Sequence, residues 1–322
     1  MFFFDLHCDT ITECHSKDKS LFDSDCHISI CKAKHLDRWV QLYAIWMPDE
    51  HRGCDALNYF DAVYERFKNE MAENSLYIKQ CMNSQDLDDC LSQGKAAAIL
   101  SVEGGSALAG SLDRIDYIFS LGVKLITLTW NASNELGYGC LVKNGGGLTA
   151  FGKQALRKIN ELKIVADVSH LNRKGFWDAA DLSSAPFVAS HSTCAAILEK
   201  WRKPSDDKYF SLLRSLDDEQ IKFIADTGGL IGINFCGSFL GDKGDDGFEA
   251  VYRHMSHILD IGGEDVLAIG SDFDGCDINA ELAGIDKIPD LARSLERRGM
   301  DKKLLNKIFF DNAYSFFKAA MS

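Results

Sequence analysis

The chain has 322 residues, of which 46% are hydrophobic, and its formal net charge at pH 7 is -13. The apolar content is sufficient for a large buried core. The negative charge argues against a nucleic-acid or anionic-membrane surface, because both select basic patches on a protein. A bilayer span needs ~20 consecutive apolar residues, and the sequence contains no such stretch. We therefore expect neither a nucleic-acid nor a membrane partner.

Eleven cysteines are scattered along the chain, and no two of them form a Cys-x-x-Cys motif. This pattern supports neither a zinc ribbon nor a thioredoxin motif. We expect most of the cysteines to be reduced, buried, small hydrophobic residues in a reducing cytoplasm. The first residues also lack the basic segment of a signal peptide. The sequence thus predicts a cytoplasmic protein.

Short apolar runs alternate with longer amphipathic segments along the whole chain. The predicted strands are, in chain order, Phe2–Leu6, Val40–Ile45, Ala97–Val102, Lys124–Leu128, Ile164–Val168, Phe187–Ser190, Leu230–Asn234 and Val266–Gly270. The predicted helices include Ala56–Glu73, Ser111–Leu121, Ala150–Leu162, Lys174–Ala180, Asp217–Thr227, Phe248–Ile261 and Asp290–Arg298. The last segment, Asp301–Ala320, predicts one or two closing helices.

This alternation indicates an α/β fold. Near-continuous apolar strands separated by helices are typical of a parallel sheet that is covered on both faces. Eight such units without a break favour a closed (β/α)₈ TIM barrel over an open, doubly wound sheet, which is the alternative. We predict a single barrel domain over residues 1–322.

Polar side chains, several of them of the types that bind metals, follow the ends of most predicted strands. Barrel enzymes carry their active sites at the carboxyl ends of the strands. His7 and Asp9 stand two residues apart at the first strand end, so an extended chain would point both to one side. Later strand ends add, in order, Glu103, Trp130 with Asn131, His170, His191, Asn234 and Asp272.

Three histidines and three carboxylates in these positions suit a pair of divalent cations, and the ligand types alone allow Zn²⁺, Mn²⁺ or Fe²⁺. We predict that one metal binds His7, Asp9 and Glu103, and that the second binds Glu103, His170 and His191. Two cations ~3.5–4 Å apart can hold a hydroxide between them and polarise a carbonyl. Taken alone, each of these residues could be a solvated side chain, part of a turn or a helix cap. Their joint placement at successive strand ends favours a metal site.

Five motifs resemble the membrane (renal) dipeptidase family of zinc metallopeptidases, nearly from end to end. They are His7-Cys8-Asp9, Glu103-Gly104-Gly105, the block from Gly147-Leu148-Thr149 to Asp167-Val168-Ser169-His170, Ser190-His191-Ser192, and Gly270-Ser271-Asp272-Phe273-Asp274-Gly275. The resemblance implies an amidohydrolase-type barrel with two Zn²⁺ ions bridged by Glu103 and a hydroxide. It also implies hydrolysis of dipeptides, often with a D-residue at the carboxyl position, and an acid/base role for Asp272.

The substrate side of the site matches the family less closely. Family members bind the substrate carboxylate with an arginine after the sixth-strand histidine; Arg214 fits that segment, with Arg202 as the reserve, and Asn234 follows at a fitting spacing. The vertebrate enzymes carry a histidine where this chain has Trp130. An indole N–H donates one hydrogen bond but cannot titrate. Trp130 is therefore predicted to orient the substrate without acting as an acid.

Two other functions remain open at this point. The metal-binding residues alone also fit another amidohydrolase-type enzyme, such as an amidase, lactonase or deaminase, and a catalytically silent, metal-stabilised binding protein. The arginine and the five motifs favour the dipeptidase. Several animal members are secreted and lipid-anchored, whereas this chain resembles a soluble bacterial-type relative. Family members are often homodimers, and the sequence carries no interface signature.

Overall fold

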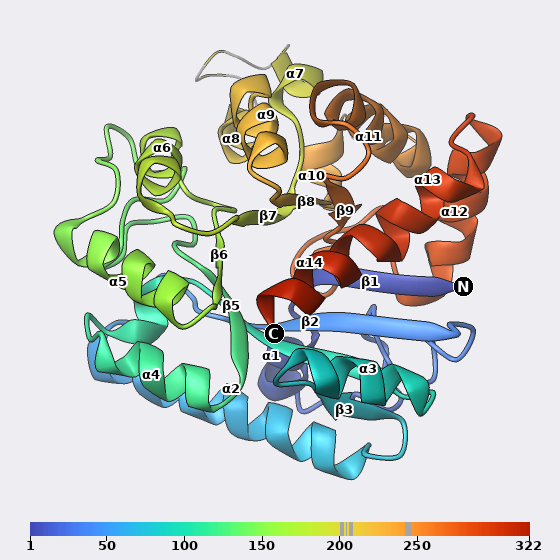
Figure 1. Ribbon diagram of the computed structural model, residues 1–322, viewed down its shortest axis with the longest axis horizontal. Helices are drawn as coiled ribbons and strands as arrows, with labels where there is room; N and C mark the ends of the chain where they lie inside the picture. Colours follow the sequence, from blue (N-terminus) through green and yellow to red (C-terminus); the bar gives the residue numbers. More distant parts are fainter. Residues whose placement is uncertain (200–202, 204, 206–208, 242–245) are drawn as a thin grey trace.

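The computed structural model describes residues 1–199, 203, 205, 209–241 and 246–322, and it contains a closed parallel barrel (Figure 1). The barrel closes because β2 pairs with β4, and β1 pairs with both β2 and β9. Its eight strands are β1 (Phe2–Cys8), β2 (Arg38–Trp46), β4 (Ala96–Glu103), β5 (Val123–Thr127), β6 (Val165–Asp167), β7 (Val188–Ser192), β8 (Leu230–Ile233) and β9 (Leu267–Ile269). The predicted TIM barrel and all eight predicted strands are confirmed.

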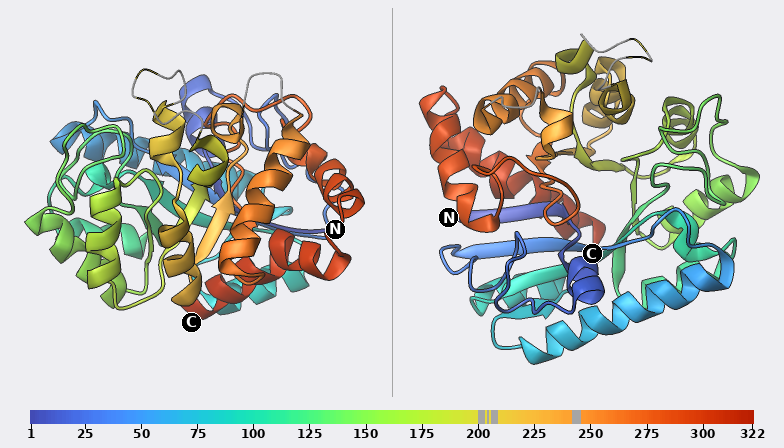
Figure 2. Two further views of the ribbon diagram at one scale, coloured as in Figure 1. Left: turned by 90° about the horizontal axis from the view of Figure 1, so that it is seen from above. Right: turned by 180° about the vertical axis from the view of Figure 1, so that it is seen from behind.

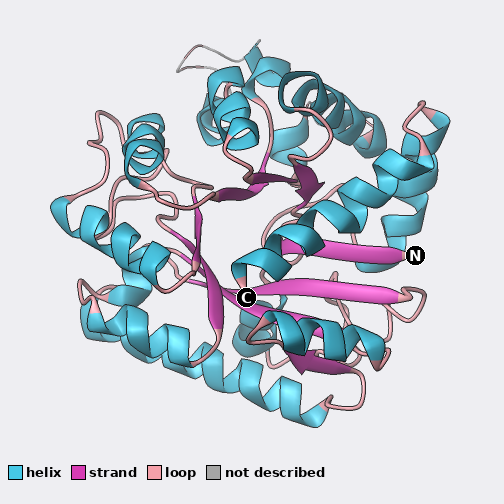
Figure 3. Cartoon of the chain, in the orientation of Figure 1, coloured by secondary structure: helices cyan, strands magenta, loops and turns pink. Residues whose placement is uncertain are grey.

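Helices surround the strands on the outside (Figures 2 and 3). They are α1 (Thr10–Lys17), α2 (Gly53–Glu73), α3 (Ser84–Ser92), α4 (Asp113–Ser120), α5 (Ala150–Glu161), α6 (Arg173–Leu182), α7 (Ala195–Leu198), α8 (Tyr209–Arg214), α9 (Asp218–Asp226), α10 (Gly237–Leu240), α11 (Gly247–Gly262), α12 (Ile288–Arg297), α13 (Lys302–Asn306) and α14 (Asn312–Ala320). A π-helical segment, Lys307–Asp311, joins the last two. Within the described part of the chain, no helix has the length and apolar character needed to cross a membrane.

A short ninth strand, β3 (Ile78–Gln80), pairs with the start of β4 and was not predicted. Of its three residues only Ile78 is buried, so the segment carries no apolar run. Short edge strands of this kind leave little signal in a sequence, because strand prediction depends on a pattern several residues long. The strand does not contribute to the closure of the barrel.

The interior of the barrel is apolar toward the amino ends of the strands. Each of the eight strands contributes at least one buried side chain to this core: Phe4, Leu6, Val40, Leu42, Ala97, Ile99, Leu125, Val165, Val188, Leu230 and Ala268. The π segment and α14 cover its base with Phe310 and Phe317, and the rings of Phe4 and Phe317 lie 5.5 Å apart. The packed core thereby confines polar chemistry to the opposite, carboxyl end.

Candidate metal centre

The five predicted metal ligands meet at the carboxyl end of the barrel, and all five are buried. Glu103 lies in the middle of the group. Its Oε2 atom is 3.4 Å from Nε2 of His7, and its Oε1 atom is 2.9 Å and 3.3 Å from Nε2 of His170 and His191. Asp9 Oδ2 lies 3.5 Å from the same His7 nitrogen. One carboxylate therefore faces two sets of donors, as a bridging ligand must.

His7 and Asp9 converge for a different reason from the one predicted. Strand β1 ends at Cys8, and its register with β2 shifts between Asp5 and Cys8. Asp9 has φ -99° and ψ 13° and precedes α1, so it is not part of an extended chain. The simple two-residue alternation of a strand was the wrong argument. The bend at the strand end turns the Asp9 carboxylate toward His7.

The donor set fits divalent cations. His7, Asp9 and Glu103 form one group whose donor atoms all lie within 4.8 Å, and Glu103, His170 and His191 form another. Both ring nitrogens of His7 and Oδ1 of Asp9 are buried and make no hydrogen bond to the described residues. Buried polar atoms without partners are costly. A cation bound by Nε2 of His7 and by the Asp9 carboxylate would give one nitrogen and one oxygen of this group a partner.

The pKa shifts of the clustered residues also fit a binding site for cations. Burial raises the pKa of the Asp9 carboxyl to about 7, and the Glu103 charge adds to this. Burial also lowers the pKa of His170, and it lowers that of His191 well below its usual value. Burial opposes charge on Glu103 and His7, but their mutual attraction holds the pKa of Glu103 well below and that of His7 well above normal. A cation bound between these groups would supply the positive charge that favours the ionised carboxylates.

Hydrogen bonds to the second ring nitrogen orient two of the three histidines. Nδ1 of His170 lies 2.8 Å from Oδ1 of Asn131. Nδ1 of His191 lies 2.7 Å from Oγ of Ser190, which in turn donates to Oδ2 of Asp167 at 2.6 Å. Such contacts place the proton on Nδ1 and leave Nε2 free for a metal. Both Asp167 and Ser190 stand in motifs quoted from the sequence, but the sequence alone indicated no role for either; the available signal was a carboxylate inside an apolar strand.

Asp272 and Asn234 stand beside the cluster as a pair. Asp272 has a left-handed backbone, with φ 61°, which is uncommon for a residue other than glycine. Its Oδ1 atom is 4.0 Å from Nε2 of His7, and its Oδ2 atom accepts a hydrogen bond of 2.9 Å from the Asn234 amide. Asn234 is fully buried and also donates to the His191 carbonyl at 3.2 Å. Asn234 therefore holds Asp272 in place from behind.

A cavity of about 430 Å³ opens above the cluster. Asp9, Glu103, His170 and Asp272 line its floor. Five aromatic residues are among those that line its walls: Trp46, Tyr59, Trp130, Phe210 and Phe239. The rings of Trp46 and Trp130 meet edge to face at 5.0 Å, and the Trp130 ring lies 6.2 Å from that of His170. Trp130 is therefore a wall of the cavity, next to a metal ligand.

Arg214 lies at the end of α8, next to the metal cluster. Its side chain is only 4% exposed, and it donates to Oγ of Ser192 at 3.0 Å and to the His191 carbonyl at 2.8 Å. Its Nε atom has no hydrogen-bond partner among the described residues. The guanidinium also contributes to the lowered pKa of His170. Arg202, the reserve for this position, lies outside the described residues.

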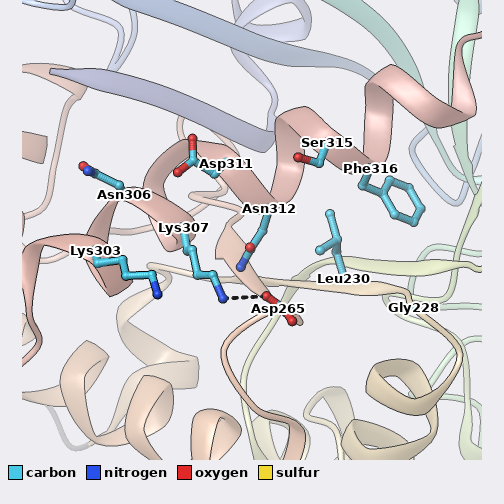
Figure 4. Close-up of a pocket in the computed structure, with 10 residues that line it drawn as sticks. All are labelled: Gly228, Leu230, Asp265, Lys303, Asn306, Lys307, Asp311, Asn312, Ser315 and Phe316. Atoms are coloured by element: carbon cyan, nitrogen blue, oxygen red, sulfur yellow. Dashed lines mark hydrogen bonds and ion pairs between the residues drawn. The ribbon is translucent and has the colours of Figure 1, made fainter.

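A second cavity, of about 690 Å³, opens at the amino ends of β8 and β9 (Figure 4). It lies between the C-terminal helices and Asp265, whose Oδ1 atom pairs with Nζ of Lys307 at 2.7 Å. Its size exceeds that of the cavity above the metal ligands. Nevertheless, the metal-capable groups found among the described residues all lie at the opposite end of the barrel. We therefore place the functional site at the carboxyl end.

Comparison with known proteins agrees with this geometry. Residues 1–321 match the model of the family described as membrane dipeptidase, peptidase family M19. The chain belongs to this family. Like its relatives, it is a metal-dependent hydrolase of the dipeptidase type.

Solved structures of M19 enzymes closely resemble the chain. The dipeptidase AC, an M19 metallopeptidase, superposes with a TM-score of 0.89 at 28% identity, over 100% of this chain and 99% of that one. A metallopeptidase from Rhodobacter sphaeroides, liganded with a phosphinate mimic of the dipeptide L-Ala-D-Ala, gives 0.89 at 26% identity with the same coverage. A Klebsiella pneumoniae protein, described only as uncharacterised in the pqqA 5' region, is 31% identical over 76% of this chain and 90% of its own length.

Proposed function

We propose that this M19 protein hydrolyses the peptide bond of dipeptides, including dipeptides with a C-terminal D-residue, with two Zn²⁺ ions at the carboxyl end of the barrel. The residues that would hold them are His7, Asp9, Glu103, His170 and His191. The position of Glu103 carries the proposal, because its two oxygens face two different sets of buried donors. When bound there, two such cations would polarise the scissile carbonyl and lower the pKa of water toward ~7.

Asp272 has the position of a general acid/base. Its Oδ1 atom faces the metal cluster, and the Asn234 amide holds its Oδ2 atom. In this proposal, Asp272 takes a proton from the attacking water at Oδ1 and returns it to the leaving amine. Asn234 keeps the carboxylate from rotating away between the two transfers.

Arg214 and the aromatic wall select the substrate. The buried Arg214 guanidinium supplies a fixed positive charge beside His191, where it pairs with the carboxylate of a dipeptide. Because this cation is fixed beside the metal ligands, the carboxylate that pairs with it must lie close to the reacting bond. The substrate is therefore limited to two residues. Trp130 lines the cavity above the metal ligands beside His170, and it packs along the substrate there. Acceptance of a D-residue is supported by the Rhodobacter sphaeroides relative, whose ligand mimics L-Ala-D-Ala.

The test is a metal determination followed by hydrolysis of L-Ala-L-Ala, L-Ala-D-Ala and a tripeptide. We expect two metal ions per chain, turnover of both dipeptides and much slower turnover of the tripeptide. Asp272→Asn should keep both metals and abolish turnover, whereas Asp265→Asn, the same change at the far end of the barrel, should behave as the parent. Two bound metals without turnover of any dipeptide would instead favour an amidase, a lactonase or a silent metal-binding protein.

A further inference from the structure

Two cysteines line the cavity above the metal ligands and contact each other. Cys236 directly precedes α10, and Cys276 follows Asp272 by four residues. Each thiol shifts the pKa of the other, so the two sulfurs lie close together. Sγ of Cys276 also lies 3.6 Å from the carbonyl oxygen of Asp272, and Sγ of Cys236 lies 3.1 Å from Oγ of Ser238. A dithiol therefore stands beside the proposed acid/base residue.

The backbone holds these two segments together. Cys236 forms an antiparallel bridge with Ile278, and the Gly237 N–H donates to the Asp277 carbonyl at 2.9 Å. The amide of Cys236 is also fixed, because it donates to Oδ1 of Asn234 at 2.6 Å. The two sulfurs are thus kept adjacent by main-chain contacts on both segments.

The two thiols differ in reactivity. The contact with Cys276 lowers the pKa of Cys236, although burial opposes this. The same contact, together with burial, raises the pKa of Cys276 well above its usual value. The Ser238 hydroxyl, 3.1 Å from the Cys236 sulfur, can donate to a thiolate, whereas the Cys276 thiol donates to the Asp272 carbonyl. Thiolates are the nucleophilic form, so Cys236 is the sulfur that attacks an oxidant and Cys276 the one that resolves the product. Both border the open cavity, which admits a molecule as small as a peroxide.

The turn that carries Cys276 is tightly packed against the active site. Asp272 and Asp274 both have left-handed backbones, with φ 61° and 66°. Gly275 packs directly on two carboxylates: a Cβ atom at this residue would lie 2.0 Å from Oδ2 of Asp9 and 2.5 Å from Oδ1 of Asp272. A disulfide requires the sulfurs to approach to about 2.05 Å. Gly275, the neighbour of Cys276, therefore ties any shift of this turn to both carboxylates.

We propose that Cys236 and Cys276 form a peroxide-oxidisable site whose disulfide switches off the adjacent active site. The Cys236 sulfur attacks one oxygen of hydrogen peroxide, the O–O bond breaks, and the released hydroxide leaves as water with the Cys236 proton. The Cys276 sulfur then attacks the resulting sulfenic acid at sulfur, the S–O bond breaks, and a second water leaves with the Cys276 proton. Two thiols lose two electrons, and one peroxide becomes two waters. An external thiol restores both cysteines by exchange.

The test treats the metal-loaded protein with hydrogen peroxide and then with dithiothreitol. Peptide mapping by mass spectrometry without reduction follows the disulfide, and hydrolysis of L-Ala-D-Ala follows activity, each variant being normalised to its own reduced state. Because an ångström of misplacement at an active site typically costs about 100-fold, we expect a loss of this order that dithiothreitol reverses. A linked peptide containing residues 236 and 276 should accompany the loss.

Cys236→Ser and Cys276→Ser should abolish the reversible loss. Cys90→Ser is the matched control, because Cys81 and Cys90 form another contacting thiol pair at the amino end of the barrel, away from the site. The control should respond as the parent does. The absence of the linked peptide, a linked peptide with unchanged activity, or an equal reversible loss in Cys276→Ser would overturn the proposal. The activity readout rests on the proposed function, whereas the linked peptide forms whether or not dipeptides are substrates.

Discussion

Replacement of Gly275 by alanine should disable the site without unfolding the barrel. The added Cβ atom would lie 2.0 Å from Oδ2 of Asp9 and 2.5 Å from Oδ1 of Asp272, whereas real Cβ contacts are almost never shorter than 3.0 Å. The carboxylates or the turn must therefore shift by about 1 Å, a displacement that typically costs about 100-fold in rate. We expect kcat/KM for dipeptides to fall by this factor, with weaker binding of the metal held by Asp9.

The assay combines steady-state hydrolysis of L-Ala-D-Ala with metal content and a urea unfolding curve. Gly137→Ala is the matched control, because its Cβ would lie 3.3 Å from the flexible end of Leu148 and at ordinary contact distances, 3.5 and 3.6 Å, from the nearest backbone atoms. That variant should keep both activity and metal. If Gly275→Ala matched the parent in both, the turn would have relaxed away from the carboxylates. The argument that this turn transmits movement to the active site would then be refuted.

Three further predictions concern the residues around the site and the core. Arg214→Met should lower kcat/KM for dipeptides at least about 30-fold, mainly through KM, because loss of one partner of a buried charge pair costs 2–5 kcal/mol; a dipeptide amide should be affected much less. Ser190→Ala should weaken metal binding about 10–100-fold in a chelator competition, because His191 loses the contact that orients its ring. His254 is buried and its pKa is lowered to about 4, chiefly by burial, so the unfolded chain binds the extra proton between pH 6.5 and 4. The free energy of unfolding should therefore fall by up to about 3 kcal/mol as the pH drops through this range, and His254→Gln should reduce that loss.

The fold could be predicted because buried parallel strands consist almost entirely of apolar residues. Each strand of the barrel left such a run, from Phe2–Leu6 to Val266–Gly270. The short β3 and the helix α1, which begins at Thr10 directly after Asp9, left no comparable pattern. Tertiary packing rather than local sequence fixes these elements.

The site was predicted as a set of strand ends, but not as a set of contacts. The chain order of His170 and His191 indicates that both lie at one end of the barrel, and the structure brings their Nε2 atoms to 3.0 Å. The contact between Ser190 and Asp167 depends on which strands are neighbours and on their register, which the sequence does not encode locally. The same limitation applies to Asp5, an acidic residue in an apolar strand. It accepts hydrogen bonds from Ser271, and burial raises its pKa to about 6.

The closure of the barrel sets the order in which the protein can be built. Strand β1 pairs with β9 between Asp5 and Ile269, and α14 seals the base beneath Phe4. A ribosome releases the first strand long before the last one exists, so the nascent chain exposes its inner apolar faces for most of synthesis. Contacts so distant in sequence also slow folding. His7 therefore meets Asp272 only after β9 has been synthesised, so the metal site proposed above is completed late in synthesis.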